Sequence, residues 1–96
     1  MPPPRNREVP AQPSGRLDER LAGALGRVRP LEELTAALER EDDVIRAQVL
    51  PGVVKTRPPM VELVIVQRQD DGSEVPWTYD LVMEPDGRLH VRARHP

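Results

Sequence analysis

Residues 60–84 read MVELVIVQRQDDGSEVPWTYDLVME, and this stretch decides the fold. Apolar and polar side chains alternate on both sides of the turn sequence at 70–72, which is typical of two half-buried strands joined by a hairpin. A two-residue loop would set apolar side chains against polar ones. A three-residue loop, with Gly72 in the left-handed conformation, instead sets apolar residues opposite each other on one face: Val61 with Leu81, Leu63 with Tyr79 and Ile65 with Trp77.

A second hairpin is predicted at 85–87, where proline and glycine suit a type I turn followed by a left-handed residue. Its register sets Met83 opposite Leu89, Leu81 opposite Val91, Tyr79 opposite Ala93 and, on the reverse face, Asp80 opposite Arg92. The two hairpins predict one antiparallel meander with strands over about 60–69, 75–84 and 88–94. Because Pro76 cannot donate a ladder bond, we expect a bulge there or regular pairing only from Trp77.

The first half of the chain has helical periodicity. Apolar side chains recur at steps of three and four from Leu17 to Val28 and from Leu31 to Leu38, which predicts two helices. The second helix should extend to about Glu41 or Asp42. Residues 44–50 alternate with a period of two, which leaves open a fourth strand or a continued helix.

These patterns predict an α+β domain over residues 16–96, with one or two N-terminal helices packed on a three- to four-stranded antiparallel β-meander. Residues 1–15 are rich in proline and almost free of apolar side chains, so we expect a disordered arm there. The second helix is expected to cover the meander with Leu31, Leu34 and Leu38. The predicted core face of the meander comprises Val61, Leu63, Ile65, Val75, Trp77, Tyr79, Leu81, Met83, Leu89, Val91 and Ala93.

The opposite face of the predicted meander holds a few valines among charged residues. The candidate partner surface comprises Val64, Val66, Val82, Arg68, Asp80, His90, Arg92 and Arg94. One interpretation is a surface for a protein partner or for a homodimer through the sheet. The other is an ordinary half-exposed sheet face, or a face that the first helix covers. Both interpretations stay open at this point.

The composition narrows the function classes. The chain has 96 residues and no cysteine, which excludes disulfide scaffolds, thiolate metal sites and cysteine nucleophiles. His90 and His95 are the only imidazoles and lack metal-ligand spacing, and Ser14 and Ser73 lie outside any nucleophile motif. We therefore expect no enzyme, no catalytic residues, no cofactor and no metal.

The charge argues against binding to nucleic acid, and the hydropathy argues against a membrane-spanning segment. The formal net charge is −2, and Asp80 and Glu84 neutralise the arginines predicted nearby, on a face without stacking aromatics. The longest apolar run, at 63–66, is far too short to span a bilayer. The first residues lack the apolar core of a signal peptide, so we expect a cytoplasmic protein.

Within residues 61–94 the meander resembles the gas vesicle accessory protein O family. The stretches that carry the resemblance are 61–63 (VEL), Arg68, 79–81 (YDL) and 86–89 (DGRL), similar to the family's V-E-V strand, arginine, Y-E-V strand and D-G-E-L turn. The sequence departs from the family at 57–59, which reads RPP in place of D-G-W, and at 69–70, which lacks the isoleucine-proline. The resemblance implies a non-catalytic accessory protein that acts through protein contacts in gas vesicle assembly.

These observations favour a small non-enzymatic accessory or adaptor protein with an unidentified protein partner. A PepSY domain is similar in its tyrosine-containing strand and D-G turn, which implies a regulatory or inhibitory module as an alternative. A small ribonuclease-type toxin also pairs helices with a meander, and would need a basic cleft formed by Arg88, His90, Arg92 and Arg94. The sequence pI of about 5.7 argues against that third hypothesis.

Overall fold

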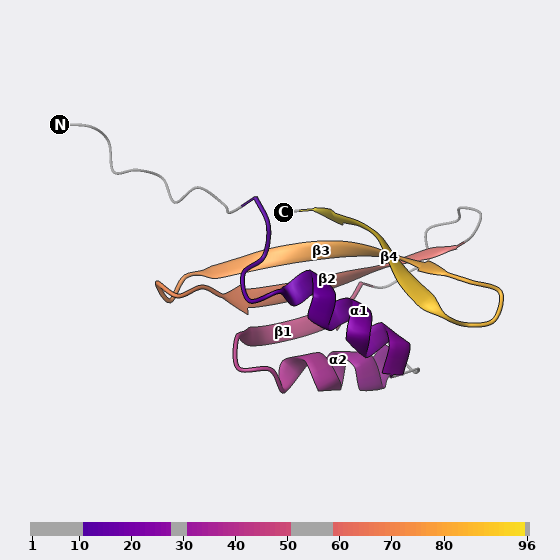
Figure 1. Cartoon of the computed structure of the whole chain (residues 1–96), viewed down its shortest axis with the longest axis horizontal. Helices are drawn as coiled ribbons and strands as arrows, with labels where there is room; N and C mark the ends of the chain where they lie inside the picture. Colours follow the sequence, from indigo (N-terminus) through magenta and orange to yellow (C-terminus); the bar gives the residue numbers. More distant parts are fainter. Residues whose placement is uncertain (1–10, 28–30, 51–58, 96) are drawn as a thin grey trace.

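Two helices and four strands make up the described part of the chain, which in this computed structural model comprises residues 11–27, 31–50 and 59–95 (Figure 1). The strands form one antiparallel sheet in the order β1-β2-β3-β4, so the α+β architecture is confirmed. The elements are α1 (Leu17–Arg27), α2 (Leu31–Glu39), β1 (Val44–Val49), β2 (Met60–Arg68), β3 (Glu74–Met83) and β4 (Leu89–His95).

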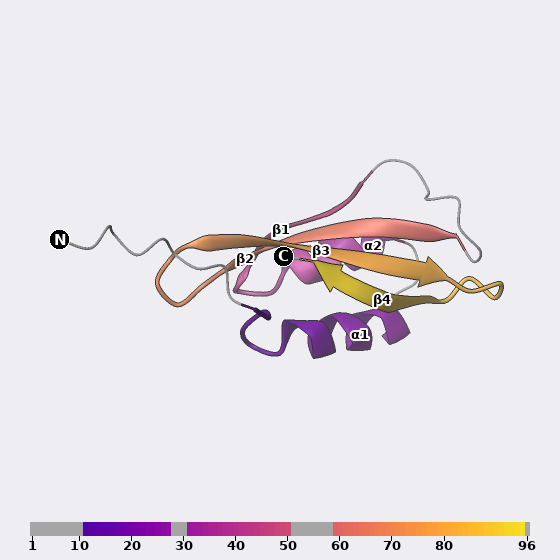
Figure 2. The same cartoon turned by 90° about the horizontal axis from the view of Figure 1, so that it is seen from above.

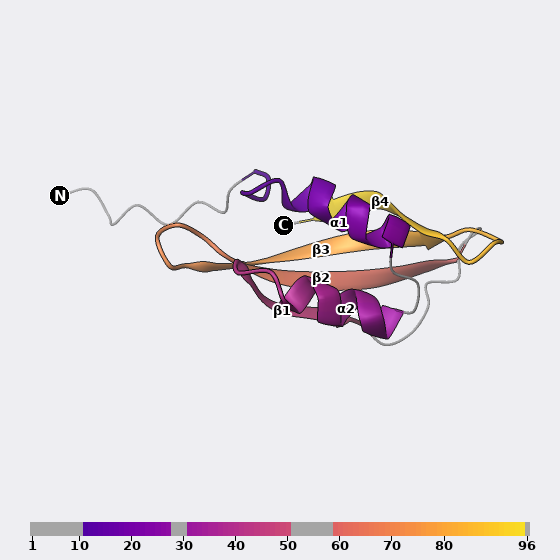
Figure 3. The ribbon, with the colours of Figure 1, turned by 60° about the horizontal axis from the view of Figure 1, so that its bottom comes forward.

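Both helices pack on the same face of the sheet, called here the inner face. Helix α2 contacts β1 and α1 contacts β4, as Figure 3 shows, and Figure 2 shows α1 on one side of the layer of strands. Burying the apolar stripe of each helix against the sheet stabilises both elements. The opposite face of the sheet, called here the outer face, carries neither helix. The buried core residues are Leu17, Leu21, Ala24, Leu34, Leu38, Val44, Ala47, Val61, Leu63, Ile65, Val75, Trp77, Tyr79 and Leu81.

The hairpin of β2 and β3 has the predicted register. Val61 pairs with Leu81, Leu63 with Tyr79 and Ile65 with Trp77. The loop is closed where the Gln69 N–H donates to the Ser73 carbonyl over 2.7 Å, and Gly72 has a φ of 86°, in the left-handed region that favours glycine. The register places Trp77 and Tyr79, the chain's two aromatic side chains, fully inside the core.

Pairing through Pro76 is regular, so the bulge expected there is wrong. Hydrogen-bonded pairs alternate along antiparallel strands. Because Gln69 donates to Ser73, the alternation makes Val66 and Pro76 a pair without hydrogen bonds, and the Pro76 nitrogen faces away from β2. On its other side, β4 reaches only to Thr78 in the described residues. A missing N–H at this position therefore removes no ladder bond.

Strand β4 starts in the predicted register and then departs from it. Met83 pairs with Leu89 and Leu81 with Val91, as expected. Beyond them Asp80 pairs with Ala93 and Tyr79 with Arg94, because a bulge adds Arg92 to β4. The predicted pairs Tyr79–Ala93 and Asp80–Arg92 are therefore wrong. The one-residue shift moves Ala93 to the outer face and Arg94 to the inner face.

The segment that sequence periodicity left undecided is strand β1, which also contains a bulge. Val44 pairs with Gln67 and Arg46 with Val66, so Ile45 is the extra residue, and Val44 and Ala47 reach the core. Helix α2 ends at Glu39, before the predicted end, because the acidic run at 41–43 opposes the negative end of the helix dipole. The Leu31 side chain, and residues 1–10 of the predicted arm, lie outside the described residues.

Candidate functional site

Strand β2 runs through the middle of the outer face, and after Met60 it presents four more side chains there. In chain order they are Glu62, Val64, Val66 and Arg68, with their Cα partners on β3 being Asp80, Thr78, Pro76 and Glu74. Val64 and Val66 are half-buried although no described helix lies over them. Both valines of the candidate partner surface therefore lie on the same strand, two residues apart, with a charged side chain at either end of the row.

The charges at the two ends of this row have different surroundings. Glu62 and Asp80 are directly opposite each other, an arrangement of like charges that destabilises a sheet. The Asp80 carboxylate is 2.8 Å from the Nε2 atom of His95 and its side chain is only 17% exposed. The side chains of Glu62 and Arg68 make no hydrogen bond or ion pair with any described residue.

The end of the outer face beyond Glu62 is covered by its own side chains. Val82 is only 5% exposed, between its Cα partners Met60 and His90. The Arg92 guanidinium reaches the Met60 Sδ atom over 3.4 Å, and the His90 Nδ1 atom is 3.1 Å from a Glu84 oxygen. Val82, His90 and Arg92 of the predicted surface thus lie against neighbouring side chains, and Val82 is less exposed than Val64 and Val66.

Arg94 does not lie with the other predicted surface residues, which corrects the expectation from sequence. Its Nε atom donates to both carboxylate oxygens of Asp18 over 3.0 and 3.1 Å, and its guanidinium lies 5.3 Å from the centre of the Trp77 ring. The Tyr79 hydroxyl donates to the same Asp18 carboxylate over 2.6 Å. Burial and this hydrogen bond raise the pKa of Tyr79 well above its usual range. The cluster ties β3 and β4 to the first turn of α1.

A second polar cluster surrounds Gln67, the only fully buried polar side chain among the described residues. Its amide nitrogen donates to the Ser14 carbonyl and to Asp43, each over 2.8 Å, and its amide oxygen accepts from the Trp77 indole over 3.2 Å. Arg20 donates two hydrogen bonds to Asp43 over 2.9 and 2.6 Å, and these bonds hold the pKa of Asp43 below its usual range.

Sequence reasoning named none of the residues Asp18, Arg20, Asp43 and Gln67. One signal was available, since Gln67 continues the inner-face series 61, 63, 65 with a polar side chain. Within the described residues no buried side-chain polar atom lacks a hydrogen-bond partner. The clusters around Tyr79 and Gln67 are therefore complete by themselves, and their polar groups are already engaged within the fold.

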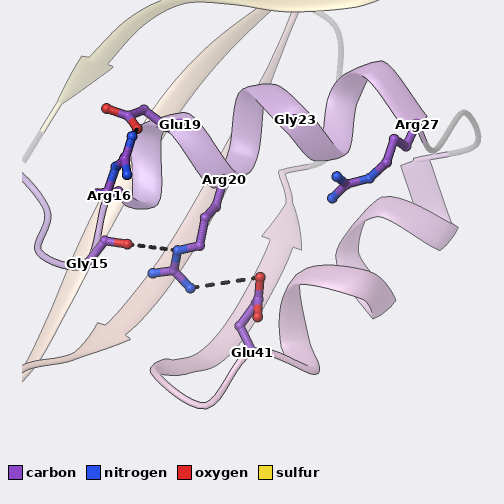
Figure 4. A pocket seen from close by; sticks show the side chains of 7 residues that line it. All are labelled: Gly15, Arg16, Glu19, Arg20, Gly23, Arg27 and Glu41. Carbon is purple, nitrogen blue, oxygen red and sulfur yellow. Dashed lines mark hydrogen bonds and ion pairs between the residues drawn. The ribbon is translucent and has the colours of Figure 1, made fainter.

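A groove of about 300 Å³ lies between α1 and the turn that joins α2 to β1 (Figure 4). Most of its charges are paired: Arg16 with Glu19 over 2.6 Å, and Arg20 with Glu41 over 3.8 Å and with Asp43, outside the lining, over 2.6 Å. Arg27 has no such partner among the described residues. The groove mixes both signs of charge and so selects neither anions nor cations. Its lining residues are Gly15, Arg16, Glu19, Arg20, Gly23, Arg27 and Glu41.

The described residues provide neither a metal site nor a membrane-spanning helix. In the ranges 11–27, 31–50 and 59–95, no three His, Asp or Glu side chains are arranged to hold a metal ion. Neither described helix is long and apolar enough to cross a membrane. No family model, curated protein or solved structure matches this chain.

Proposed function

We propose that this chain is a non-enzymatic accessory or adaptor protein that binds a protein partner through the outer face of its sheet. The observation that carries the proposal is the row on β2, where two half-buried valines lie between Glu62 and Arg68. Half-buried valines lose further contact with water when a partner covers them. Side chains of Glu62 and Arg68 without partners among the described residues are available to select that partner.

Two features of the inner face support a binding role over catalysis. The buried polar side chains of the described residues already have hydrogen-bond partners within the fold. A catalytic group needs polar atoms directed at a substrate in a cleft, whereas most charges of the described groove are paired and lie on an exposed face of α1. The finer form of the proposal is a role in gas vesicle assembly, which rests on the resemblance of residues 61–94.

Site-specific photo-crosslinking in cells tests the proposal. A photoreactive residue replaces Val64, and in a control variant it replaces Ala22, an exposed residue of α1. We expect one dominant crosslinked species from position 64 and none of comparable yield from position 22. Mass spectrometry identifies the partner, and a gas vesicle shell protein would support the finer form. Equal yields at both positions, or none at position 64, would contradict binding through the outer face.

A further inference from the structure

We infer that the partner of the outer face is a second copy of this chain, packed face to face with β2 antiparallel to β2 of the second copy. The inference rests on the proposed function and names the occupant of the same surface. Its origin is the order of side chains along β2, which is acid, valine, valine, base at positions 62, 64, 66 and 68. This order is self-complementary about Ile65.

A two-fold axis that lies between two facing sheets, perpendicular to β2, reverses the direction of the strand. Positions equally far from Ile65 then meet. Val64 contacts Val66 of the second copy, and Glu62 contacts Arg68 of the second copy. Each of these contacts occurs twice, because a two-fold interface is isologous. The symmetry therefore pairs at once both charges that lack a partner among the described residues, and it buries both valines.

Residues on the neighbouring strands strengthen the contact between Glu62 and Arg68 of the second copy. Glu62 and Asp80 lie opposite each other, and among the described residues the His95 imidazole is the only side chain that pairs with either carboxylate. Arg68 of the second copy would approach both carboxylates, which removes the like-charge repulsion of this pair. Arg46 lies beside Val66 on β1 and would meet Gln48 of the second copy, an uncharged residue.

One corner of the arrangement is unfavourable. Glu74, the Cα partner of Arg68, would approach Asp80 of the second copy. The His95 imidazole, 2.8 Å from the Asp80 carboxylate, moderates this repulsion. Because Arg68 of the second copy also approaches Asp80, the two Glu62–Arg68 contacts at the ends of the β2 row outweigh the contacts at the β3 corners.

The size of the contact predicts a weak dimer. From Glu62 to Arg68 the strand extends about 20 Å, and four strands at their usual spacing are about 15–19 Å across. A face of this size is at the low end of specific interfaces, below about 800 Å² per partner. We expect a dissociation constant in the micromolar range or weaker, measured on the full chain by sedimentation velocity.

Charge reversal tests the symmetry. Glu62→Arg places two Arg–Arg contacts in each dimer and Arg68→Glu places two Glu–Glu contacts, so each variant alone should dimerise at least about tenfold more weakly. The double variant Glu62→Arg/Arg68→Glu restores both contacts and should dimerise within about threefold of the wild type. An equimolar mixture of the two single variants should form heterodimers, because every contact between them joins opposite charges.

Matched controls separate these effects from net charge and folding. Glu33→Arg on α2 and Arg40→Glu in the turn after it change the charge by the same amounts at exposed positions off the outer face. They should leave dimerisation unchanged, and circular dichroism should be the same for all variants. Single variants that weaken dimerisation without rescue in the mixture would overturn the antiparallel arrangement.

A wild type that stays monomeric at several hundred micromolar would overturn the inference of a second copy. That outcome is distinct from failure of the proposed function, since crosslinks from position 64 to a different protein would still support binding through the outer face. If the crosslinked species has twice the mass of the chain, both proposals are supported together.

Discussion

On the inner face of β2, Gln67 is fully buried and its amide has four hydrogen-bond partners. On the outer face, in contrast, the next residue, Arg68, is exposed, and its side chain has no hydrogen-bond partner among the described residues. The same contrast holds between Leu63, which is fully buried, and Val64, which is half-buried. A buried polar group without partners is costly, so the fold has satisfied those of the inner face. The outer face has no such requirement while it is in water, and the charges of Glu62 and Arg68, which have no partner in the described part of the chain, are available for binding.

The largest expected effect that distinguishes the two faces comes from truncating adjacent residues of β2. Leu63→Ala should lower the free energy of unfolding by about 2–5 kcal/mol, because it leaves a cavity in the core. Val64→Ala should cost less than about 1 kcal/mol, since it removes only β-branching at a half-exposed position. Urea unfolding followed by fluorescence of Trp77, the only tryptophan, measures both. Equal losses would contradict the assignment of the two faces.

The polar core offers a second comparison. Gln67→Leu keeps a side chain of similar size but leaves the Trp77 indole N–H without its acceptor and removes one of the two hydrogen bonds to the Ser14 carbonyl, so it should cost about 1–3 kcal/mol. Gln48→Leu changes the same residue type on the outer face, where Gln48 is exposed, and should change stability by about 0.5 kcal/mol or less. A neutral Gln67→Leu in the same urea experiment would show that the cluster contributes nothing to stability.

The fold could be predicted from the sequence because each hairpin carries its register in local signals. The loops at 70–72 and 85–87 contain the glycine that a three-residue turn requires, and only one register sets apolar side chains opposite one another. These signals are independent of the rest of the chain. Two confirmed turns therefore fix three of the four strands and the identity of the core face.

The bulge at Arg92 and the polar clusters could not be predicted in the same way. Both depend on contacts between residues far apart in sequence, such as Asp18 with Arg94 and Arg20 with Asp43. Strand pairing alone favours Asp80 opposite Arg92, whereas the helix α1 offers Asp18 to Arg94 on the inner face. This tertiary contact accompanies the shifted register, and it moves Arg94 off the predicted partner surface.

The Arg20–Asp43 pair makes stability depend on pH in the acid range. Because hydrogen bonds from Arg20 lower the pKa of Asp43 below 3.8, the unfolded chain takes up a proton at higher pH than the folded chain. The stabilisation is present above about pH 4 and is lost as the pH falls through the folded pKa. Asp43→Asn should cost about 1–2 kcal/mol at neutral pH and make the acid decline shallower. Asp42→Asn, at an exposed neighbour, should leave the decline unchanged in urea titrations between pH 2 and 6.

Tyr79→Phe is expected to have the smallest effect on the free energy of unfolding, and Tyr79 makes stability depend on pH in the opposite direction to Asp43. Tyr79→Phe removes the hydroxyl that donates to Asp18, which should cost about 0.5–1.5 kcal/mol at pH 7. Burial raises the pKa of Tyr79, so only the unfolded chain releases the phenolic proton near pH 10. The wild type should therefore lose stability as the pH rises above 10, and Tyr79→Phe should lack this decline. Since the chain has a single tyrosine, phenolate absorbance of the folded protein reports its ionisation directly. A folded Tyr79 that ionises near pH 10 would contradict its place inside the core, beneath α1.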